Sequence, residues 1–249
     1  MKEIFLQMKI KILDILFPAI CLNCQKEGTW ICQNCLSLIE ILEYQYCPFC
    51  QERVFACLSG SQEKGTCKKH RGKNLNGLFF AASYKNPLVK KLIKRFKYSP
   101  LLKELAPSLS SLIITHFISS GNKIIFNDQK ASLFIPVPLS PAKKRWRGFN
   151  QSEEIAKELS KFLKIPYQVN NLIKIKKTQL QVELSREERE KNIKGAFMVK
   201  NPKEIQGKRI FLVDDVFTSG ATMEECARVL KKAGAKQVWG IAVAREESD

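Results

Sequence analysis

Two adjacent carboxylates, Asp214 and Asp215, are the side chains best placed for chemistry, because one apolar run delivers both to the same point. A stretch of small residues follows almost at once, comprising Thr218, Ser219, Gly220, Ala221 and Thr222. Backbone N–H groups of such a turn, at the start of a helix, can hold a phosphate, whereas paired carboxylates suit sugar hydroxyls or Mg²⁺. The combination predicts a site for a ribose 5-phosphate that carries further phosphate. A Walker-type loop is excluded because the chain has no Gly-x4-Gly-Lys motif.

A second group of candidate residues lies in the basic segment PAKKRWRGFNQ, which follows the apolar run SLFIPVPL. We expect a loop here, next to the carboxyl end of a strand, where open α/β sheets bind their ligands. Its cations are suited to neutralising a polyanionic phosphate group together with magnesium, and they are Lys143, Lys144, Arg145 and Arg147. A solvated basic loop is the alternative interpretation of each side chain.

Cysteines near the start of the chain have the spacing of metal ligands. Cys21, Cys24, Cys32 and Cys35 form two Cys-x2-Cys pairs, and a two-residue gap lets both thiolates of a pair turn toward one ion. Four sulfur ligands leave no position for a reactive water, so the pattern predicts a structural zinc ion.

A second set of metal ligands consists of Cys47, Cys50, Cys67 and His70. This spacing fits a zinc ribbon if His70 supplies the fourth ligand. Three alternatives remain open: Cys57 replaces one ligand, the two sites exchange pairs, or the second set binds nothing. We therefore expect one or two structural zinc ions.

The positive charge of the chain is concentrated in its middle. Lys and Arg number 42 against 24 Asp and Glu, a formal charge of +18, and residues 71–170 hold 18 of the basic but only 5 of the acidic side chains. A helix over residues 88–98 would collect cations on one face, namely Lys90, Lys91, Lys94, Arg95 and Lys97, of which the first four are the candidate DNA contacts. This face is either simply solvated or a tract that binds the backbone of single-stranded DNA without sequence preference.

Apolar periodicity indicates the elements that must position these residues. Strands are expected at 78–84, 132–139, 172–175, 195–199, 208–215 and 237–244, and helices at 86–98, 102–118, 152–163 and 223–234. Alternating strands and helices predict an α/β fold with a mostly parallel sheet flanked by helices. We expect three parts: an amphipathic helix over residues 1–18, a cysteine-rich zinc-ribbon module over 19–70, and the α/β domain over 71–249.

The motifs together resemble a known family. FLVDDVFTSGAT looks like the 5-phosphoribosyl-1-pyrophosphate (PRPP) motif of type I phosphoribosyltransferases. The order of cysteine knuckles, LFFAASYKNPLVKKLIKRFKY, IPVPLSPAKKRWRGFNQS and KTQLQVELSREEREKNIKGAF resembles the ComF family of competence-associated proteins over nearly the whole chain. His70 departs from that pattern, because relatives usually carry cysteine there.

The resemblance implies a role for each segment. Asp214 and Asp215 would contact the ribose hydroxyls, residues 218–222 would hold the 5-phosphate, residues 138–147 would approach the pyrophosphate, and a mobile loop at about 176–192 would close over the site. It implies a type I phosphoribosyltransferase fold that binds PRPP with Mg²⁺.

ComF membership implies a part in DNA uptake during natural transformation, with single-stranded DNA and other DNA-uptake proteins as partners. The alternative is an active enzyme that transfers the phosphoribosyl group of PRPP to an unidentified acceptor. Reduced thiols and the lack of a long apolar run favour a cytoplasmic protein without a membrane span. A peripheral position at the inner face of the membrane is a second interpretation, based on the amphipathic helix.

Overall fold

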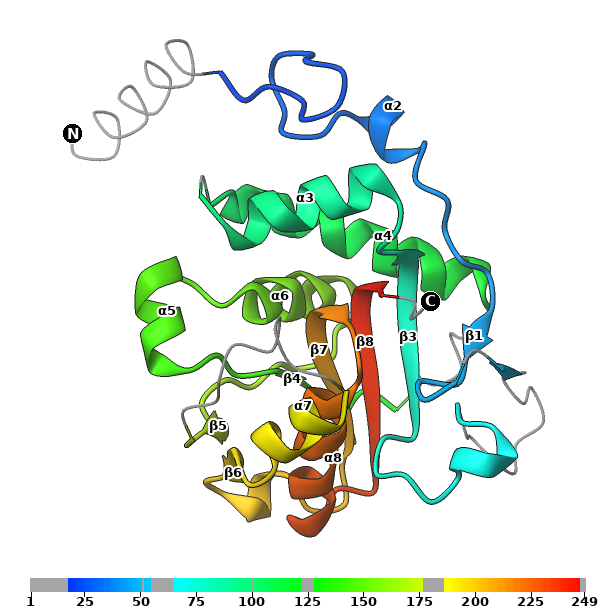
Figure 1. Cartoon of the computed structure of the whole chain (residues 1–249), viewed down its shortest axis with the longest axis vertical. Helices are drawn as coiled ribbons and strands as arrows, with labels where there is room; N and C mark the ends of the chain where they lie inside the picture. Colours follow the sequence, from blue (N-terminus) through cyan, green and yellow to red (C-terminus); the bar gives the residue numbers. More distant parts are fainter. Residues whose placement is uncertain are drawn as a thin grey trace. The chain divides into compact units, whose positions relative to one another are not determined.

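The computed structural model describes residues 18–50, 52–54, 65–99, 101–121, 128–176 and 186–246, which form two compact units, Met1–Glu40 and Ile41–Asp249 (Figure 1). The expected N-terminal helix and Cys57 lie outside the described residues. The division after Glu40 differs from the boundary expected after residue 70. The second cysteine set therefore belongs to the same unit as the α/β domain.

A four-stranded parallel sheet forms the centre of the larger unit, in the order β3-β8-β7-β4. The strands are β3 (Gly77–Ser83), β8 (Gln237–Arg245), β7 (Arg209–Phe217) and β4 (Ser132–Pro136). Nearly every residue of these strands is buried, as expected for parallel strands covered on both faces. The predicted α/β fold with a parallel sheet is confirmed.

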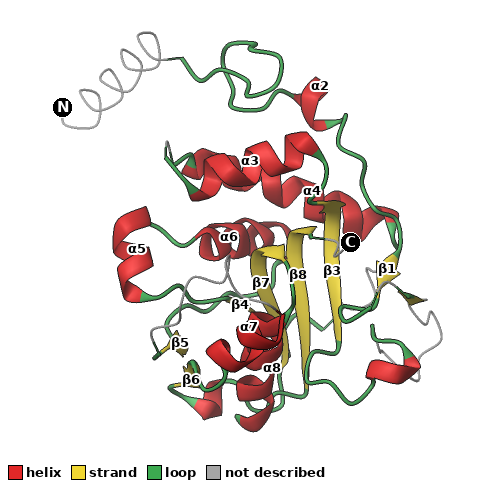
Figure 2. Ribbon diagram, viewed as in Figure 1, coloured by secondary structure: helices red, strands yellow, loops and turns green. Residues whose placement is uncertain are grey.

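Helices cover both faces of this sheet (Figure 2). On one face lie α4 (Ala106–Ser119) and α6 (Gln151–Leu163), which pack against each other and against the strands. On the other face α8 (Ala221–Lys232) packs with Ile210 and Leu212 of β7, which point to the same side because side chains alternate along a strand. None of the helices in the described ranges is long and apolar enough to cross a membrane.

Smaller elements complete the fold. They are α2 (Gln33–Leu36), β1 (Gln45–Tyr46), β2 (Arg53–Val54), α3 (Pro87–Lys97), α5 (Pro141–Arg147), β5 (Leu172–Lys174), α7 (Arg186–Ile193) and β6 (Phe197–Val199). Short 3₁₀ turns occupy Lys68–His70, Lys103–Leu105 and Pro202–Glu204. β1 pairs with β2 and β5 pairs with β6, both antiparallel.

The basic segment after β4 is a helix, so the prediction of a loop there is wrong. The side chain of Ser140 accepts a hydrogen bond from the backbone N–H of Lys143, Pro141 fits the first turn, and Gly148 ends α5 with a φ of 75°. These are standard start and stop signals for a helix.

Two further boundaries differ from the prediction. β7 continues through the two carboxylates to Phe217, and α8 begins at Ala221, so the small-residue turn is shorter than expected. The charged stretch after β5, where the resemblance implied a mobile loop, contains α7 in its described part.

Candidate functional site

The carboxylate pair lies near the C-terminal end of β7, where the next strand of the sheet on that side, β4, also ends. The two side chains turn to different partners. Asp214 accepts a hydrogen bond from the Ser152 hydroxyl at 2.9 Å, and Asp215 forms an ion pair with the Lys97 ammonium at 2.8 Å. Helices α6 and α3 thus hold the two carboxylates in place.

Lys97 is the residue of this site that the sequence analysis misassigned, since it was placed on the solvated cationic face of its helix. It follows Val89 by eight positions and Ile93 by four, and both of those residues are fully buried. That spacing puts Lys97 on the apolar row of α3 and is the signal that would have found it. Burial alone would lower the pKa of Lys97, but the ion pair with Asp215 outweighs it and raises the pKa.

Burial and the neighbouring Asp215 carboxylate raise the pKa of Asp214 to about 7, although Lys97, the Asp215 N–H and Ser152 oppose this. The carboxylates are also held by their own backbone: the N–H of Asp215 donates to Asp214 at 2.9 Å, and the N–H of Val216 donates to Asp215 at 2.6 Å. Such fixed oxygens suit ligand hydroxyls or a divalent cation.

The turn between β7 and α8 requires glycine at one position. Gly220 has a φ of 78°, and a Cβ atom there would lie 2.5 Å from the ring of Phe217. The backbone therefore approaches closely and turns directly into α8. The first N–H groups of an α-helix have no carbonyl partners within the helix, and the positive end of the dipole lies there, so this turn can hold an anion.

Cations from three elements converge beside the carboxylates. The pKa of Lys143 on α5 is lowered by burial and then by Arg147 and Lys97, and the pKa of Lys174 on β5 is lowered by burial and then by Lys143. These side chains are close enough to repel one another, so a polyanion bound among them would relieve the repulsion. The sequence analysis named Lys143 and Arg147 but not Lys174.

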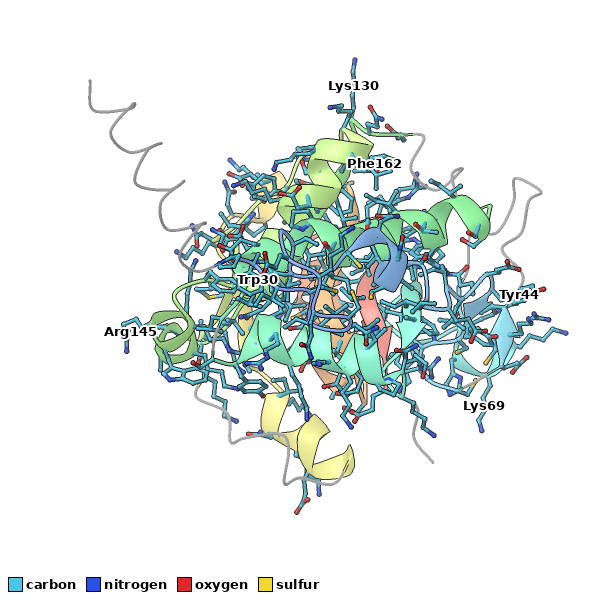
Figure 3. The ribbon with its side chains drawn as sticks, turned by 90° about the horizontal axis from the view of Figure 1, so that it is seen from above. Trp30, Tyr44, Lys69, Lys130, Arg145 and Phe162 are labelled. Carbon is cyan, nitrogen blue, oxygen red and sulfur yellow. The ribbon has the colours of Figure 1, made fainter. Side chains whose placement is uncertain are left out.

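The other two predicted cations of α5, Lys144 and Arg145, are not part of this cationic cluster. Lys144 forms an ion pair with Glu153 at 3.2 Å. Arg145 is exposed, and its side chain extends outward from α5 (Figure 3). Both still line a cavity of about 340 Å³ between the turn after β4, the start of α6 and residues 168–174.

The remaining predictions on the larger unit are placed as follows. On α3, Lys90, Lys91 and Lys94 are exposed and Arg95 is half-buried. Most of the expected mobile loop, residues 177–185, lies outside the described residues. The roles assigned to the individual site residues remain predictions.

The first cysteine group forms within the smaller unit. The four sulfur atoms of Cys21, Cys24, Cys32 and Cys35 all lie within 4.8 Å of one another, and those of Cys24 and Cys32 are 3.6 Å apart. A tetrahedron of Zn–S bonds of about 2.3 Å has edges of about 3.8 Å, so the group fits zinc. Burial would raise the pKa of Cys21, but backbone N–H groups of Cys24, Cys32 and Asn23 lower it to about 6, which favours the ligating thiolate.

The second group forms within the larger unit and includes His70. The ligand atoms of Cys47, Cys50, Cys67 and His70 also lie within 4.8 Å of one another, with the Nδ1 atom of His70 3.1 Å from the sulfur of Cys67. This donor set fits a zinc ion as well. Among the described residues, two groups could thus each hold a metal ion, and neither requires an exchange of pairs.

Arg245 connects the second cysteine group to the sheet. It is the last residue of β8, is buried, and donates to the carbonyl oxygens of Cys47 at 3.1 Å and of Pro48 and Cys50 at 3.4 Å. In the strand register it lies beside Phe217, which precedes the small-residue turn. The metal-binding group is therefore attached to the same edge of the sheet as the carboxylate site.

Comparison with known proteins agrees with this structure. A phosphoribosyl transferase domain matches residues 147–248. Competence protein F of Haemophilus influenzae is 31% identical over 239 residues, covering 89% of this chain and 96% of that protein. DNA utilization protein YhgH of Escherichia coli strain K12 is 33% identical over 164 residues, which cover 65% of this chain and 70% of that protein. Competence protein ComFC of Streptococcus pneumoniae is 25% identical over 221 residues, which cover 89% of this chain and 90% of that protein. The chain belongs to the ComF family of competence proteins, as the resemblance of its motifs implied.

Proposed function

We propose that this protein binds PRPP together with Mg²⁺ at the C-terminal edge of its parallel sheet. The observation that carries the proposal is the pair of fixed carboxylates directly before the glycine turn of α8, with Lys97 ion-paired to one of them at 2.8 Å. Sugar hydroxyls and phosphate need opposite kinds of partner, and this edge offers carboxylates and an anion-binding turn within a few residues.

Each part of PRPP has a matching group in this arrangement. The turn formed by residues 218–222 would hold the 5-phosphate, and Asp214 and Asp215 would accept hydrogen bonds from the ribose hydroxyls. Lys143 and Arg147 would face the pyrophosphate, with Lys174 beside them. Magnesium, when bound, would neutralise part of the pyrophosphate charge.

We further propose that the protein takes part in DNA uptake and handles single-stranded DNA. The names of its relatives, competence protein and DNA utilization protein, support the first statement. The cationic row on α3 supports the second, because a row of lysines on one helix face can follow a phosphate backbone without reading bases. Such binding should weaken steeply with salt.

The cavity beside α5 favours a second candidate function, transfer of the phosphoribosyl group. It has a volume of about 340 Å³ and its wall includes Lys144, Asn150 and Lys174. In this reaction a nucleophilic atom of an acceptor forms a bond to C1 of the ribose, while the bond from C1 to pyrophosphate breaks and leaves its electron pair on the departing oxygen. Pyrophosphate release with a panel of bases, amines and nucleic acids would distinguish the enzyme from a protein that only binds PRPP.

The PRPP proposal is tested by ligand-induced thermal stabilisation of the zinc-loaded protein. PRPP with Mg²⁺ should raise the melting temperature of the wild type, and the double variant Asp214→Asn/Asp215→Asn should show no such rise, because amides cannot replace two fixed anions beside Lys97. The matched control is Glu43→Gln/Glu104→Gln, which changes two exposed acids elsewhere in the larger unit. If PRPP with Mg²⁺ does not change the melting temperature of the wild type, the proposal is refuted.

A further inference from the structure

Two exposed aromatic side chains meet where α3 ends and α5 passes. Tyr98 follows the last residue of α3 and is 48% exposed, and Trp146 on α5 is 63% exposed. Their ring centroids are 6.4 Å apart with an interplanar angle of 60°. The contact leaves about half of Tyr98 and more than half of Trp146 accessible to water. We call Tyr98 and Trp146 the aromatic pair.

Cations surround the aromatic pair on two sides. The guanidinium of Arg147 lies 5.5 Å from the centre of the Tyr98 ring and donates to Gln151 at 3.0 Å. Lys90 and Lys94 lie four residues apart on one row of α3, and Tyr98, which caps the C-terminal end of this helix, follows Lys94 by four positions. Within the described ranges, no ion pair to a carboxylate is seen for either lysine.

Tyr98 and Trp146 belong neither to the carboxylate pair nor to the wall of the cavity, although Arg147 lies beside both Tyr98 and Lys143. Lys97 and Tyr98 are consecutive, but Lys97 turns inward to Asp215 whereas Tyr98 turns outward to Trp146. Neither Tyr98 nor Trp146 lines the cavity of about 340 Å³. The pair is thus accessible to a ligand that runs along the surface outside the cavity.

We infer that Tyr98 and Trp146 form a stacking platform for the bases of a single-stranded nucleic acid whose phosphates follow Lys90 and Lys94. Exposed aromatic rings within a row of cations are the combination that binds single strands, because every base has a π-face and every nucleotide a phosphate. A duplex hides the faces of its bases and would leave the rings unused. This inference rests on the proposed handling of single-stranded DNA and says which residues contact its bases.

The experiment compares two labelled oligonucleotides by fluorescence anisotropy with the full-length, zinc-loaded protein. One is an oligothymidylate of about 20 nucleotides, and the other has the same backbone but lacks bases. Trp146→Ala and Tyr98→Ala should each weaken oligothymidylate binding by about tenfold. Both variants should bind the abasic strand as the wild type does, and Trp146→Phe should recover most of the lost affinity.

Two controls separate stacking from charge and from general damage. Phe162→Ala removes an aromatic residue of α6 that is 55% exposed and lies far from Arg145 of α5, and it should bind both strands normally (Figure 3). Lys94→Gln should weaken the binding of both strands by the same factor and reduce the slope of log affinity against log salt by about 0.7. Trp146→Ala should leave that slope unchanged.

The outcomes distinguish this inference from the proposed function. Equal oligothymidylate affinity in wild type and Trp146→Ala would overturn the platform but leave DNA handling intact. Equal affinity of the wild type for the oligothymidylate and the abasic strand would also overturn the platform and leave DNA handling intact. If the wild type binds neither strand while PRPP still raises its melting temperature, the platform and the DNA role both fall and the PRPP site stands.

Discussion

Asp214 makes the stability of the fold depend on pH. Its pKa is about 7 in the folded protein against an ordinary 3.8, mainly because of burial and then the charge of Asp215. Below about pH 4 the carboxyl is protonated in both states, and as pH rises toward 7 the unfolded chain loses its proton first. The carboxyl therefore costs stability progressively over that window. Asp214→Asn should be more stable than the wild type by about 4 kcal/mol above pH 7, with little difference near pH 4.

Urea unfolding across this pH range measures the effect. Glu43→Gln is the control, since that acid is exposed, and it should show no comparable pH-dependent gain. If the difference in free energy of unfolding between the wild type and Asp214→Asn stays constant from about pH 4 to 8, the pKa of Asp214 is not raised by its surroundings.

At this scale, the residues that could be assigned to the site from the sequence are those that directly follow a predicted strand. Asp214, Asp215 and the small residues after them are consecutive, so their shared position follows from one strand and one turn. Lys97 and Ser152 reach the same carboxylates from two other helices. The positions of Lys97 and Ser152 beside the carboxylates depend on how α3 and α6 pack, which local sequence patterns do not determine. The apolar row of α3 indicates only that Lys97 turns inward.

Among the elements, the long apolar runs were the most predictable. Strands β3, β7 and β8 and helices α3, α6 and α8 lie close to their expected ranges, because apolar periodicity and caps are local signals. The order β3-β8-β7-β4 was not predicted, since it joins segments distant in sequence. α5 was missed although Ser140, Pro141 and Gly148 are helix signals, because its seven residues have no apolar face to reveal the period.

The link between β8 and the second cysteine group predicts an effect of Arg245 on metal binding. Its guanidinium donates to carbonyls of Cys47, Pro48 and Cys50 and so fixes the loop that carries two of the ligands. A lysine cannot bridge carbonyls with a planar fork. Arg245→Lys should therefore bind zinc at the second site about tenfold more weakly, as is typical when a group that orients metal ligands is lost.

Competition with a chromophoric chelator measures this difference. Arg209→Lys is the matched control, because Arg209 lies at the opposite end of the neighbouring strand and donates to Gln237 instead. If Arg245→Lys releases zinc with the wild-type affinity, the contact with the loop carbonyls does not hold the metal-binding group in place.

In the whole molecule, the formal charge of +18 serves different ligands at different places. Lys143 lies close enough to both Lys97 and Lys174 to repel them, and the proposed PRPP would relieve this repulsion. Lys90 and Lys94 instead continue along the outer face of α3 to Tyr98. The excess of basic residues was evident in the sequence, but its division between an inner and an outer group required the orientation of α3.

The division of the chain at Glu40 predicts how its two metal-binding groups behave. Each unit contains a complete set of four ligands, so the protein should hold two zinc ions by elemental analysis. Cys24→Ser should lose one ion and keep the PRPP-induced rise in melting temperature, because the carboxylate site belongs to the other unit. Cys50→Ser should lose the other ion and lower the melting temperature of the larger unit itself, since Arg245 ties that group to the end of β8. A wild type with a single zinc ion would contradict the binding of metal by both groups, and loss of the PRPP effect in Cys24→Ser would contradict the independence of the two units.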